Sequence, residues 1–294
     1  RSHHKMFKKK KDQTYQSYWS ISWNIFKKNK VAMVCLFIVI LLCLIALFAP
    51  LIAPYDPNKQ VLTDRLMKPC GQHWFGTDDL GRDIFSRIIY GCRVSLSVGI
   101  ISQIIATVIG YTMGVCAGYY GGKVDSVISF LIQVFSSFPF LLFAMAIMFV
   151  LGPGLINLYL ALGLLGWAST ARLIRGDVMR LKKMEYIDAC KVSGGNSFRI
   201  IMKHLLPNCL STLIVTVTLG VPNAIMSEAS LSFLGLGVKA PMASWGSMIS
   251  FSQPYIRSAT YYSVIPGLAI IITVLAFNML GDGLRDALDP KLRS

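Results

Sequence analysis

The sequence predicts an all-α protein that crosses a membrane several times. Of its 294 residues, 54% are hydrophobic and only 15% are charged, and the mean hydropathy is +0.57. Soluble domains average about 25% charged residues, so a chain this apolar does not fit a single water-exposed globule. Its apolar residues are gathered in long runs, and its basic residues flank those runs.

The apolar runs define the predicted spans. About 20 apolar residues in a helix cross the ~30 Å hydrocarbon core of a bilayer. The first run, residues 31–52, contains no charged side chain. We predict six transmembrane helices, at about residues 31–52, 94–117, 124–151, 155–171, 209–231 and 263–280.

Two of the spans contain residues that interrupt helices. The third span carries Pro139 close to Ser136 and Ser137, and the fourth carries Gly163 and Gly166. Such residues are tolerated at membrane depth where neighbouring helices or a water-filled cavity satisfy the backbone, and small residues let helices pack closely. We therefore expect one bundle rather than a set of independent anchors.

The basic residues orient the bundle. The formal net charge is +15. The lysine-rich lead before residue 31 and the basic block from Arg172 to Lys203 should both lie on the cytoplasmic side under the positive-inside rule. Four predicted spans separate them, and an even number returns the chain to the same side. Both termini are thus predicted to be cytoplasmic. Because the basic residues flank apolar runs, nucleic acid is not an expected partner.

This topology divides the chain into five parts. In the lead, Trp19, Trp23 and Phe26 recur at helical spacing, which predicts an interfacial helix on the inner leaflet, with a disordered basic tail as the alternative. The segment after the first span is too long for a turn and is expected to contact the outer leaflet or another protein. The parts are a cytoplasmic basic lead (1–30), the first transmembrane helix (31–52), an extracytoplasmic segment (53–93), a five-helix transmembrane core (94–281) and a cytoplasmic tail (282–294).

The sequence carries no pattern that predicts catalysis or metal binding. GYYGGK at 118–123 is one residue short of a phosphate-binding loop and lacks the Ser or Thr that should follow Lys123. The seven cysteines form no CxxC pair, so neither a zinc site nor a disulfide framework is expected. Neighbouring acids and arginines balance one another instead of forming a pair of catalytic carboxylates. These residues are Asp78, Asp79 and Asp83 with Arg82, Arg87 and Arg93.

A polar hairpin is predicted between the fourth and fifth spans, in YIDACKVSGGNSFRIIMKHLLPN (186–208). Residues up to Val192 favour helix, Gly194 and Gly195 supply the positive φ of a tight turn, and Asn196 or Ser197 can cap a second helix. Pro207 is expected to break the chain before the fifth span. The second helix would present an apolar face at i, i+3, i+4 and i+7, formed by Phe198, Ile201, Met202 and Leu205. A loop lying in the membrane surface is the alternative.

This hairpin resembles the EAA coupling loop of ABC-importer permeases. The resemblance rests on Asp188-Ala189-Cys190, on Gly194, and on Leu205-Leu206-Pro207. In that family the loop docks on an ATPase subunit and transmits the movement of ATP binding to the spans. Asp188 stands where Glu is commoner, Cys190 replaces a second Ala, and His204 holds a usually aliphatic place. The resemblance implies a coupling hairpin at 184–207 with key residues Asp188, Ala189, Cys190, Gly194, Leu205 and Pro207.

Three further stretches narrow the resemblance to the C-type permease subunit of the oligopeptide, dipeptide and nickel importers. They are HWFGTDDLGRDIFSRIIYGCRVSLSVG (73–99), EASLSFLGLGV (228–238) and PGLAIIITVLAFNMLGDGLRDALDPKLR (266–293). Together with the first span and its flanks, the resemblance covers the chain from about Trp19 to Arg293. It implies the type I ABC-importer permease fold and a multi-pass location in the cell membrane of a bacterium or archaeon.

The resemblance also implies a role and partners. The chain would form half of a pathway for di- or oligopeptides, with nickel or another small solute as the alternative. Its partners would be a sister permease, two ATPase subunits, an extracytoplasmic solute-binding protein and the lipid bilayer. ATP and Mg would be bound by the ATPases, so this chain would be no enzyme and would hold no cofactor. An ATP-independent secondary transporter is a weaker alternative, because the predicted spans carry almost no charge at their centres.

Polar residues at membrane depth are the candidates for lining a pathway. Polar and charged groups in a span usually face a cavity or a partner, because exposing them to lipid is costly. For Glu228 a structural hydrogen bond is an equal alternative, and Asn223 could instead satisfy a carbonyl freed by Pro222. The candidates are Gln103, Gln133, Ser136, Ser137, Asn223 and Glu228.

Overall fold

The computed structural model describes residues 18–289, so residues 1–17 of the basic lead and 290–294 of the tail lie outside the described residues. The described part is helical, with one isolated β-bridge between Thr77 and Asp83, and the all-α prediction is confirmed. The longer helices are α1 (Tyr18–Lys28), α2 (Lys30–Leu47), α4 (Ile84–Tyr120), α5 (Gly122–Ser137), α6 (Phe140–Leu151), α7 (Leu155–Leu181), α8 (Glu185–Val192), α10 (Leu206–Phe233), α11 (Trp245–Ser252) and α12 (Thr260–Leu288). Short turns of helix are α3 (Ala49–Ile52), η1 (Leu62–Asp64), α9 (Ser197–Ile200), η2 (Ile201–Leu205) and η3 (Gln253–Tyr255).

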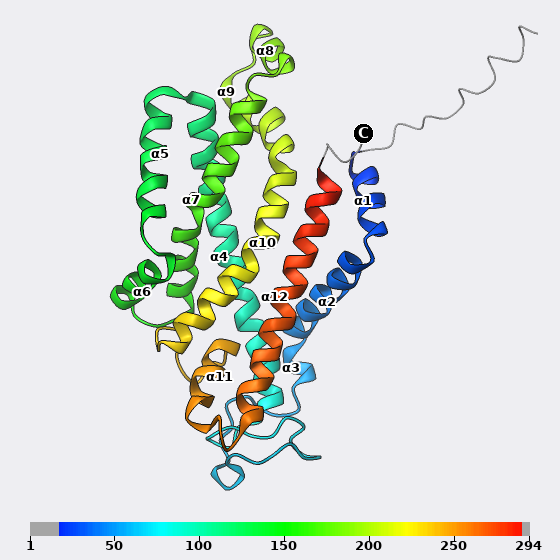
Figure 1. Cartoon of the computed structure of the whole chain (residues 1–294), viewed down its shortest axis with the longest axis vertical. Coiled ribbons are helices and arrows are strands. Elements are labelled where there is room, and N and C mark those ends of the chain that lie inside the picture. The colour runs from blue at the N-terminus through cyan, green and yellow to red at the C-terminus, as the bar shows by residue number, and fades with distance from the viewer. Residues whose placement is uncertain (1–17, 290–294) are drawn as a thin grey trace, which may run out of the picture.

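The long helices form an elongated bundle with two distinct ends. The short helices α8 and α9 project from one end, where α1 and the C-terminal end of α12 also lie (Figure 1). Segment 53–83 and α11 lie together at the opposite end (Figure 1). This is the layout expected if the basic lead and the hairpin share one side of a membrane. Which side faces the cytoplasm stays a prediction.

Four of the described helices are long and apolar enough to cross a membrane, namely α2, α4, the α9–α10 segment (Ser197–Phe233) and α12. The pair α5 and α6 would make a fifth span, but the two helices meet at a bend of 90°. The predicted third span, 124–151, is therefore broken. Pro139 lacks a backbone N–H, and the residue before it, Phe138, is extended at φ −91°, ψ 139°, as the proline ring requires.

Helix α7 continues well past the predicted end of the fourth span, from Leu155 to Leu181. It carries Arg172, Arg175 and Asp177, and it is not among the helices whose length and composition alone fit a span. The count of six spans accordingly stays a prediction. Arg175 is held by Asp125 of α5, with its NH2 group 2.7 Å from the carboxylate. This ion pair joins α7 to α5 near the end of the bundle that carries the hairpin.

Helices α4 and α7 pack closely because three glycines of α4 face α7. A Cβ atom at Gly110 would lie 2.6 Å from Cβ of Thr170, and one at Gly114 would lie 2.7 Å from the carbonyl oxygen of Ala171. A Cβ atom at Gly118 would lie 2.9 Å from Cβ of Val178 and 2.9 Å from the carbonyl oxygen of Arg175. Small residues four apart permit this approach of two backbones, which is how helices associate where water is absent.

The fifth span has no break at Pro207, contrary to the prediction. The short π-helix η2, a turn wider than that of an α-helix, runs directly into α10. The N–H of Leu206 donates to the carbonyl of Ile201, five residues earlier. The wide turn makes room for the ring of Pro207 at the start of α10, where a missing N–H is tolerated. The Asn208 side chain donates to the carbonyl of His204 at 2.6 Å.

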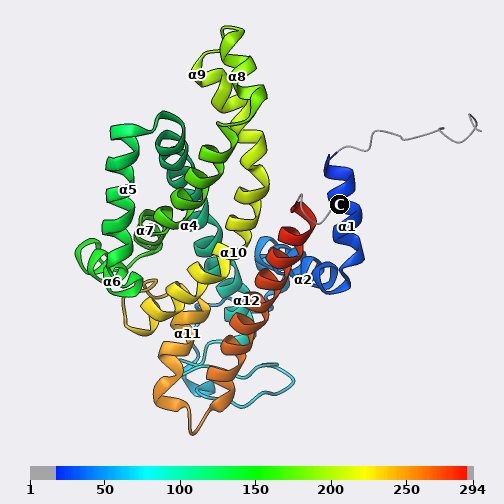
Figure 2. The same ribbon diagram turned by 45° about the horizontal axis from the view of Figure 1, so that its top comes forward.

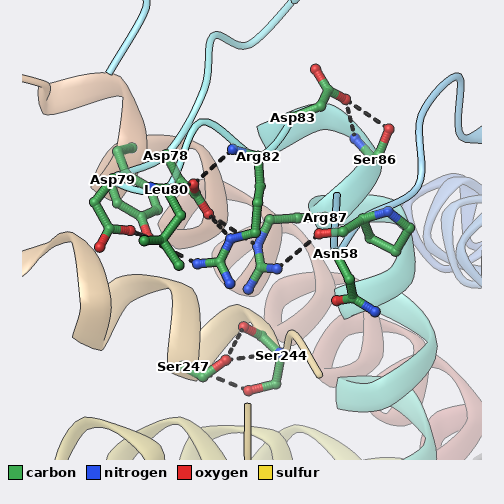
Figure 3. Close-up of polar contacts among 12 residues, drawn as sticks. Asn58, Asp78, Asp79, Leu80, Arg82, Asp83, Ser86, Arg87, Ser244 and Ser247 are labelled. Atoms are coloured by element: carbon green, nitrogen blue, oxygen red, sulfur yellow. Dashed lines mark hydrogen bonds and ion pairs between the residues drawn. The ribbon is translucent and has the colours of Figure 1, made fainter. Parts of the chain in front are cut away.

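A buried ion cluster joins segment 53–83 to the start of α4 (Figure 3). The carboxylate of Asp78 lies 2.6 Å from Nε of Arg82 and 3.5 Å from Nε of Arg87, and Arg87 also donates to the carbonyl of Pro57 at 2.9 Å. The prediction that neighbouring acids and arginines neutralise one another is confirmed for Asp78, Arg82 and Arg87. Arg93, which was predicted to belong to the same group, is exposed. Paired buried charges resist disruption, since removing one partner leaves an uncompensated ion.

Helix α4 begins at Ile84, inside the segment 53–93 that was predicted to precede the second span. Asp83 caps the helix by accepting from the N–H and the hydroxyl of Ser86, both at 2.7 Å (Figure 3). The charges of this region are therefore paired at a helix start rather than solvated in a loop.

Helix α1 lies beside the C-terminal part of α12 (Figure 2). Phe26 is buried against α12, while Trp19 and Trp23 are exposed. The amine of Lys27 lies 5.3 Å from the centre of the Trp23 ring. The three aromatic residues therefore divide between packing and an exposed surface, instead of facing the headgroups together.

Candidate functional site

A large cavity of about 1690 Å³ lies between α4, α7 and α10. The broken pair α5–α6 lines one side of it, and Trp19 of α1 and Arg285 of α12 also contribute. Such a volume exceeds that of an ordinary small-molecule pocket, which is about 300–1,000 Å³. The cavity is the principal candidate for a binding or transport path in the described part of the chain.

Helix α10 presents a polar stripe to this cavity. The stripe begins at Asn208 and ends at Ser230, 22 residues later. At a rise of about 1.5 Å per residue this is about 33 Å, close to the ~30 Å thickness of the hydrocarbon core. The lining polar residues of α10 are Asn208, Ser211, Thr212, Thr216, Asn223, Ser227 and Ser230. Polar side chains thus recur on the cavity wall over about the length of a span, between apolar lining residues such as Val215 and Leu219.

Most hydroxyl groups of the stripe donate hydrogen bonds to acceptors within the protein. Thr216 donates to the carbonyl of Thr212 at 2.7 Å, Ser227 to that of Asn223 at 2.8 Å, and Ser230 to that of Met226 at 2.9 Å. A carbonyl can only accept, so each hydroxyl proton is committed to the helix and the oxygen lone pairs stay available.

Gln103 of α4 fills the gap in the stripe between Thr216 and Asn223. Its side chain lies against Gly220, where a Cβ atom would be 2.2 Å from its carboxamide carbon. Its Nε2 donates weakly to Thr107, at 3.4 Å. Gly220 therefore creates the notch on α10 that receives Gln103.

The wall opposite α10 carries fewer polar groups. Ser102 and Thr170 both belong to the lining and are nearly fully buried, and within residues 18–289 their hydroxyls have no hydrogen-bond partner. Ser136 accepts from Arg172 at 3.0 Å. In the described part of the chain, the ionisable side chains of the lining are two acids and two bases: Asp177, Arg180, Arg285 and Asp289. Their formal charges cancel.

The structure brings three of the six predicted pathway residues to the cavity, namely Gln103, Ser136 and Asn223. The side chain of Asn223 donates to the carbonyl of Leu219 at 3.2 Å, which leaves its own oxygen free to accept. Gln133 and Ser137 are exposed elsewhere on α5 and do not line the cavity.

Glu228 lies outside the cavity, in the interior of the protein. Its Oε1 accepts from Ser232 and from Ser244, both at 2.6 Å, so it ties α10 to the start of α11. Ser244 in turn caps α11 through the N–H of Ser247 at 3.1 Å (Figure 3). These contacts favour the structural alternative for Glu228. The sequence prediction did not include Thr212, Thr216, Ser227 and Ser230, although the four-residue spacing of the first two and the three-residue spacing of the last two place each pair on one helix face.

The predicted hairpin is formed by α8, a glycine turn and α9. Gly194 adopts φ +80° with open space around it, and the side chain of Asn196 caps α9 by accepting from the N–H of Arg199 at 2.8 Å. The turn and the cap are as predicted. Gly195 does not share the positive φ predicted for both glycines, and it is tightly packed: a Cβ atom there would lie 2.6 Å from Sγ of Cys190.

The apolar face predicted for the second helix is only half right. Leu205 is buried, but Phe198 is 72% exposed and Met202 is exposed as well. Ile187 of α8 and Ile200 of α9 instead complete the buried face. The π-helical turn η2 brings Leu205 into phase with Ile200, five residues earlier, instead of with Phe198. Val192 is 90% exposed at the tip. Asp188 lies on the surface, 2.7 Å from Lys191.

The buried face joins the hairpin to α4 and α7. Ile187, Ile200 and Leu205 pack with Val115 of α4 and Val178 of α7 in one cluster. Tyr119 of α4 donates to Ser197 at 3.3 Å, and Lys182 donates to the Tyr119 carbonyl at 2.6 Å. The hairpin is therefore packed directly on α4 and α7, two of the helices that wall the cavity.

One hydrogen bond links the hairpin to the cavity lining, and a second joins two helices of that lining. Asn208, which lines the cavity, lies 3.5 Å from the hydroxyl of Tyr186 on α8. Thr212 donates to Asp177 of α7 at 2.6 Å, and both line the cavity as well. Burial, aided by nearby Cys209, raises the pKa of Tyr186, so its hydroxyl stays protonated at neutral pH.

These features together define a class: an α-helical membrane permease with a polar cavity and an exposed hairpin that is packed on the cavity walls. Within that class, the chain belongs to the family of binding-protein-dependent transport system inner membrane components, whose family model matches residues 107–294. A second family model, the N-terminal transmembrane domain of oligopeptide transport permease C, matches residues 17–69. The family resemblance drawn from the sequence is confirmed.

Curated relatives are similar over nearly the whole chain. The dipeptide transport system permease protein DppC of Bacillus subtilis (strain 168) is 46% identical, over 94% of this chain and 87% of the relative. The oligopeptide permease OppC of the same organism is 42% identical, over 94% and 91%. The glutathione permease GsiD of Pectobacterium atrosepticum is 41% identical, over 97% and 95%.

A solved structure shares the fold. A chain of the MetNI methionine ABC transporter, in an inward-facing conformation, superposes with a TM-score of 0.57 at 19% identity. The match covers 70% of this chain and 98% of that chain. At this identity the likeness shows the fold alone, and it is the fold of an ABC-importer permease.

The family establishes the general role of the chain. It is a membrane permease subunit of a binding-protein-dependent transport system rather than an enzyme, and ATP hydrolysis belongs to separate ATPase subunits. A sister permease and a substrate-binding protein are partners at the level of the family. The relatives described above are bacterial, which supports a bacterial membrane and gives no support to an archaeal one.

Proposed function

We propose that this chain forms half of the translocation pathway of a peptide importer in the bacterial plasma membrane. The observation that carries the proposal is the polar stripe of α10, which lines the cavity over about the thickness of a bilayer. Peptides are polar along their whole backbone, so they need such a wall to leave water. Relatives named for dipeptide, oligopeptide and glutathione transport support this substrate class.

The second half of the pathway comes from a sister permease packed against the open side of the cavity. Two ATPase subunits supply the energy, and an extracytoplasmic binding protein delivers the solute at the end formed by segment 53–83 and α11. The hairpin 184–207 is the contact with one ATPase. Its exposed Val192 and Phe198 would be covered by that contact, and its buried Ile187 and Leu205 would pass the movement to α4, α7 and α10.

Within the hairpin, the six predicted coupling residues have different tasks. Asp188 and Ala189 are exposed and available to the ATPase, whereas Leu205 lies in the buried cluster. Cys190 and Gly194 shape the turn, and Pro207 marks the start of α10. Neither metal nor nucleotide is assigned to this chain, because ATP and Mg would bind to the ATPases.

The test is transport by the reconstituted complex. The chain is co-expressed with its sister permease, ATPases and binding protein, and placed in vesicles that contain ATP. Uptake of labelled di- and tripeptides that needs both ATP and the binding protein is expected. Nickel uptake in place of peptide uptake would favour the alternative substrate, and uptake without ATP would support a secondary transporter. Either result would contradict the proposal.

A further inference from the structure

The hydrogen-bond polarity of the α10 stripe has a consequence for the solute. Thr216, Ser227 and Ser230 all donate to backbone carbonyls of their own helix, and Thr212 donates to Asp177. One N–H of the Asn223 amide is also directed to a carbonyl, and the amide nitrogen of Asn208 donates to the His204 carbonyl. Ser211 is the one hydroxyl of the stripe for which the structure gives no bond. What the stripe offers to the cavity is therefore mainly oxygen lone pairs, with the second N–H of Asn223 and the Ser211 hydroxyl as the remaining donors.

We propose that this wall is a selectivity surface that accepts hydrogen bonds, so that it favours solute groups that donate them, above all ammonium and backbone N–H groups. The proposal rests on the proposed function, because it specifies which parts of a peptide the permease itself recognises. The formal charges of the lining cancel, so the bias towards donors comes from the hydroxyl and amide oxygens. A solute that only accepts, such as a carboxylate, gains nothing from these oxygens and meets their partial negative charge.

Ser102 on the opposite wall supplies a second observation. Ser102 belongs to the cavity lining and is 2% exposed, and its hydroxyl oxygen is buried with no hydrogen-bond partner among the described residues. A buried hydroxyl without a partner is costly, so a solute carbonyl that reached it from the cavity would gain a hydrogen bond. Rotation of this side chain into the cavity would let it donate to a peptide carbonyl while the α10 stripe accepts from the N–H groups. The two walls would then be complementary to a peptide backbone.

Helix α10 provides its own control position. Thr218 donates to the carbonyl of Ile214 at 2.8 Å, in the same manner as Thr216 donates to Thr212, but it does not line the cavity. Thr216→Val and Thr218→Val therefore each remove one hydroxyl oxygen and one hydrogen bond from a side chain to a backbone carbonyl, in the same helix. Only the first removes an acceptor from the wall.

The first measurement needs no knowledge of the substrate. In the assembled complex, Val215→Cys places a thiol in the cavity lining beside Thr216. Its reaction rates with 2-aminoethyl and 2-sulfonatoethyl methanethiosulfonate are compared, after division by the rates for a free thiol and subtraction of labelling in the parent protein. We expect the ammonium reagent to be favoured, and Thr216→Val to reduce that preference about two- to tenfold, the factor for one net hydrogen bond. Thr218→Val should leave it unchanged.

The second measurement uses transport. The uptake ratio of a Lys-containing to a Glu-containing tripeptide is measured with the same binding protein throughout, so a change in the ratio reports on the permease. Thr216→Val combined with Ser227→Ala should lower the ratio, and Thr218→Val should not.

The outcomes separate the two ideas. If Thr216→Val and Thr218→Val leave both ratios equal to those of the unmodified chain, the acceptor wall is overturned even though peptides are transported. If the reagent preference depends on Thr216 but no peptide is taken up, the acceptor wall stands and the peptide assignment fails. Equal reactivity of the two reagents at Val215→Cys in the otherwise unmodified chain would also overturn the inference.

Discussion

The side chain of Gln103 on α4 lies in a notch of α10 that exists only because residue 220 is glycine. A Cβ atom at Gly220 would lie 2.2 Å from both the carboxamide carbon and the oxygen of Gln103. The contact joins two walls of the cavity midway along the polar stripe. It places an amide, rather than an apolar side chain, where α4 meets α10.

Gly220→Ala should displace Gln103 without unfolding the protein. The clash is with the end of a flexible side chain, so we expect a stability cost of about 1 kcal/mol or less, but a clear fall in transport. Gln103→Ala should lower transport to a similar extent, and the double variant should be no worse than either single one, because both changes remove the same contact. Gly267→Ala in α12, where a Cβ atom meets nothing within 4 Å, is the matched control. Additive losses in the double variant would contradict this account.

Gly194 should tolerate residues according to backbone conformation alone, because its surroundings are open. A β-branched residue at φ +80° costs about 1–2 kcal/mol, whereas Asn adopts this region readily. Gly194→Val should therefore insert and assemble but hydrolyse ATP with little transport, and Gly194→Asn should remain coupled. The measurement is the ratio of solute transported to ATP hydrolysed. Wild-type coupling in the assembled Gly194→Val complex would remove the hairpin from the coupling path.

The contact between α4 and α7 should be sensitive to added volume at Gly114. A Cβ atom there would lie 2.7 Å from the Ala171 carbonyl, which is backbone and cannot move aside. We expect Gly114→Leu to lower stability by about 1–3 kcal/mol or more and to lower the melting temperature in detergent. Gly176→Ala on α7 meets nothing within 4 Å, so it should be neutral or slightly stabilising. Equal melting temperatures for the two variants would show that the helices do not pack as closely in the assembled protein.

The sequence predicted the helical class and the long apolar spans well, because their signals are local. The span at 31–52 is visible from its composition, and the cap at Asn196 from its position after two glycines. The start of α4 was predicted too late, since Arg87 reads as a loop charge until Asp78 is known to lie beside it. That pairing depends on how segment 53–83 folds back.

The candidate site was predictable only in part. Gln103 and Asn223 stand out as amides in apolar runs, but the hydroxyls between them are ordinary helix residues until a shared cavity brings them together. Phe198 was assigned to the buried face because an unbroken 3.6-residue period was assumed. The wide turn at Ile201–Leu205 shifts that period, and nothing in a periodicity count reveals it.

The last prediction concerns Glu228, whose partner Ser244 comes from a separate segment of the chain. Glu228→Ala removes the acceptor of two buried hydroxyls and leaves a cavity, so we expect a loss of about 2–4 kcal/mol and faster hydrogen exchange in α11. Glu228→Gln keeps an acceptor oxygen in the same place, and its stability should lie within about 1 kcal/mol of the unmodified chain. Ser230→Ala, two residues away on the cavity side of α10, is the control and should not change exchange in α11. If Glu228→Ala leaves α11 as protected as before but alters solute selectivity, Glu228 acts in the pathway and its position in the interior does not describe the transporting state.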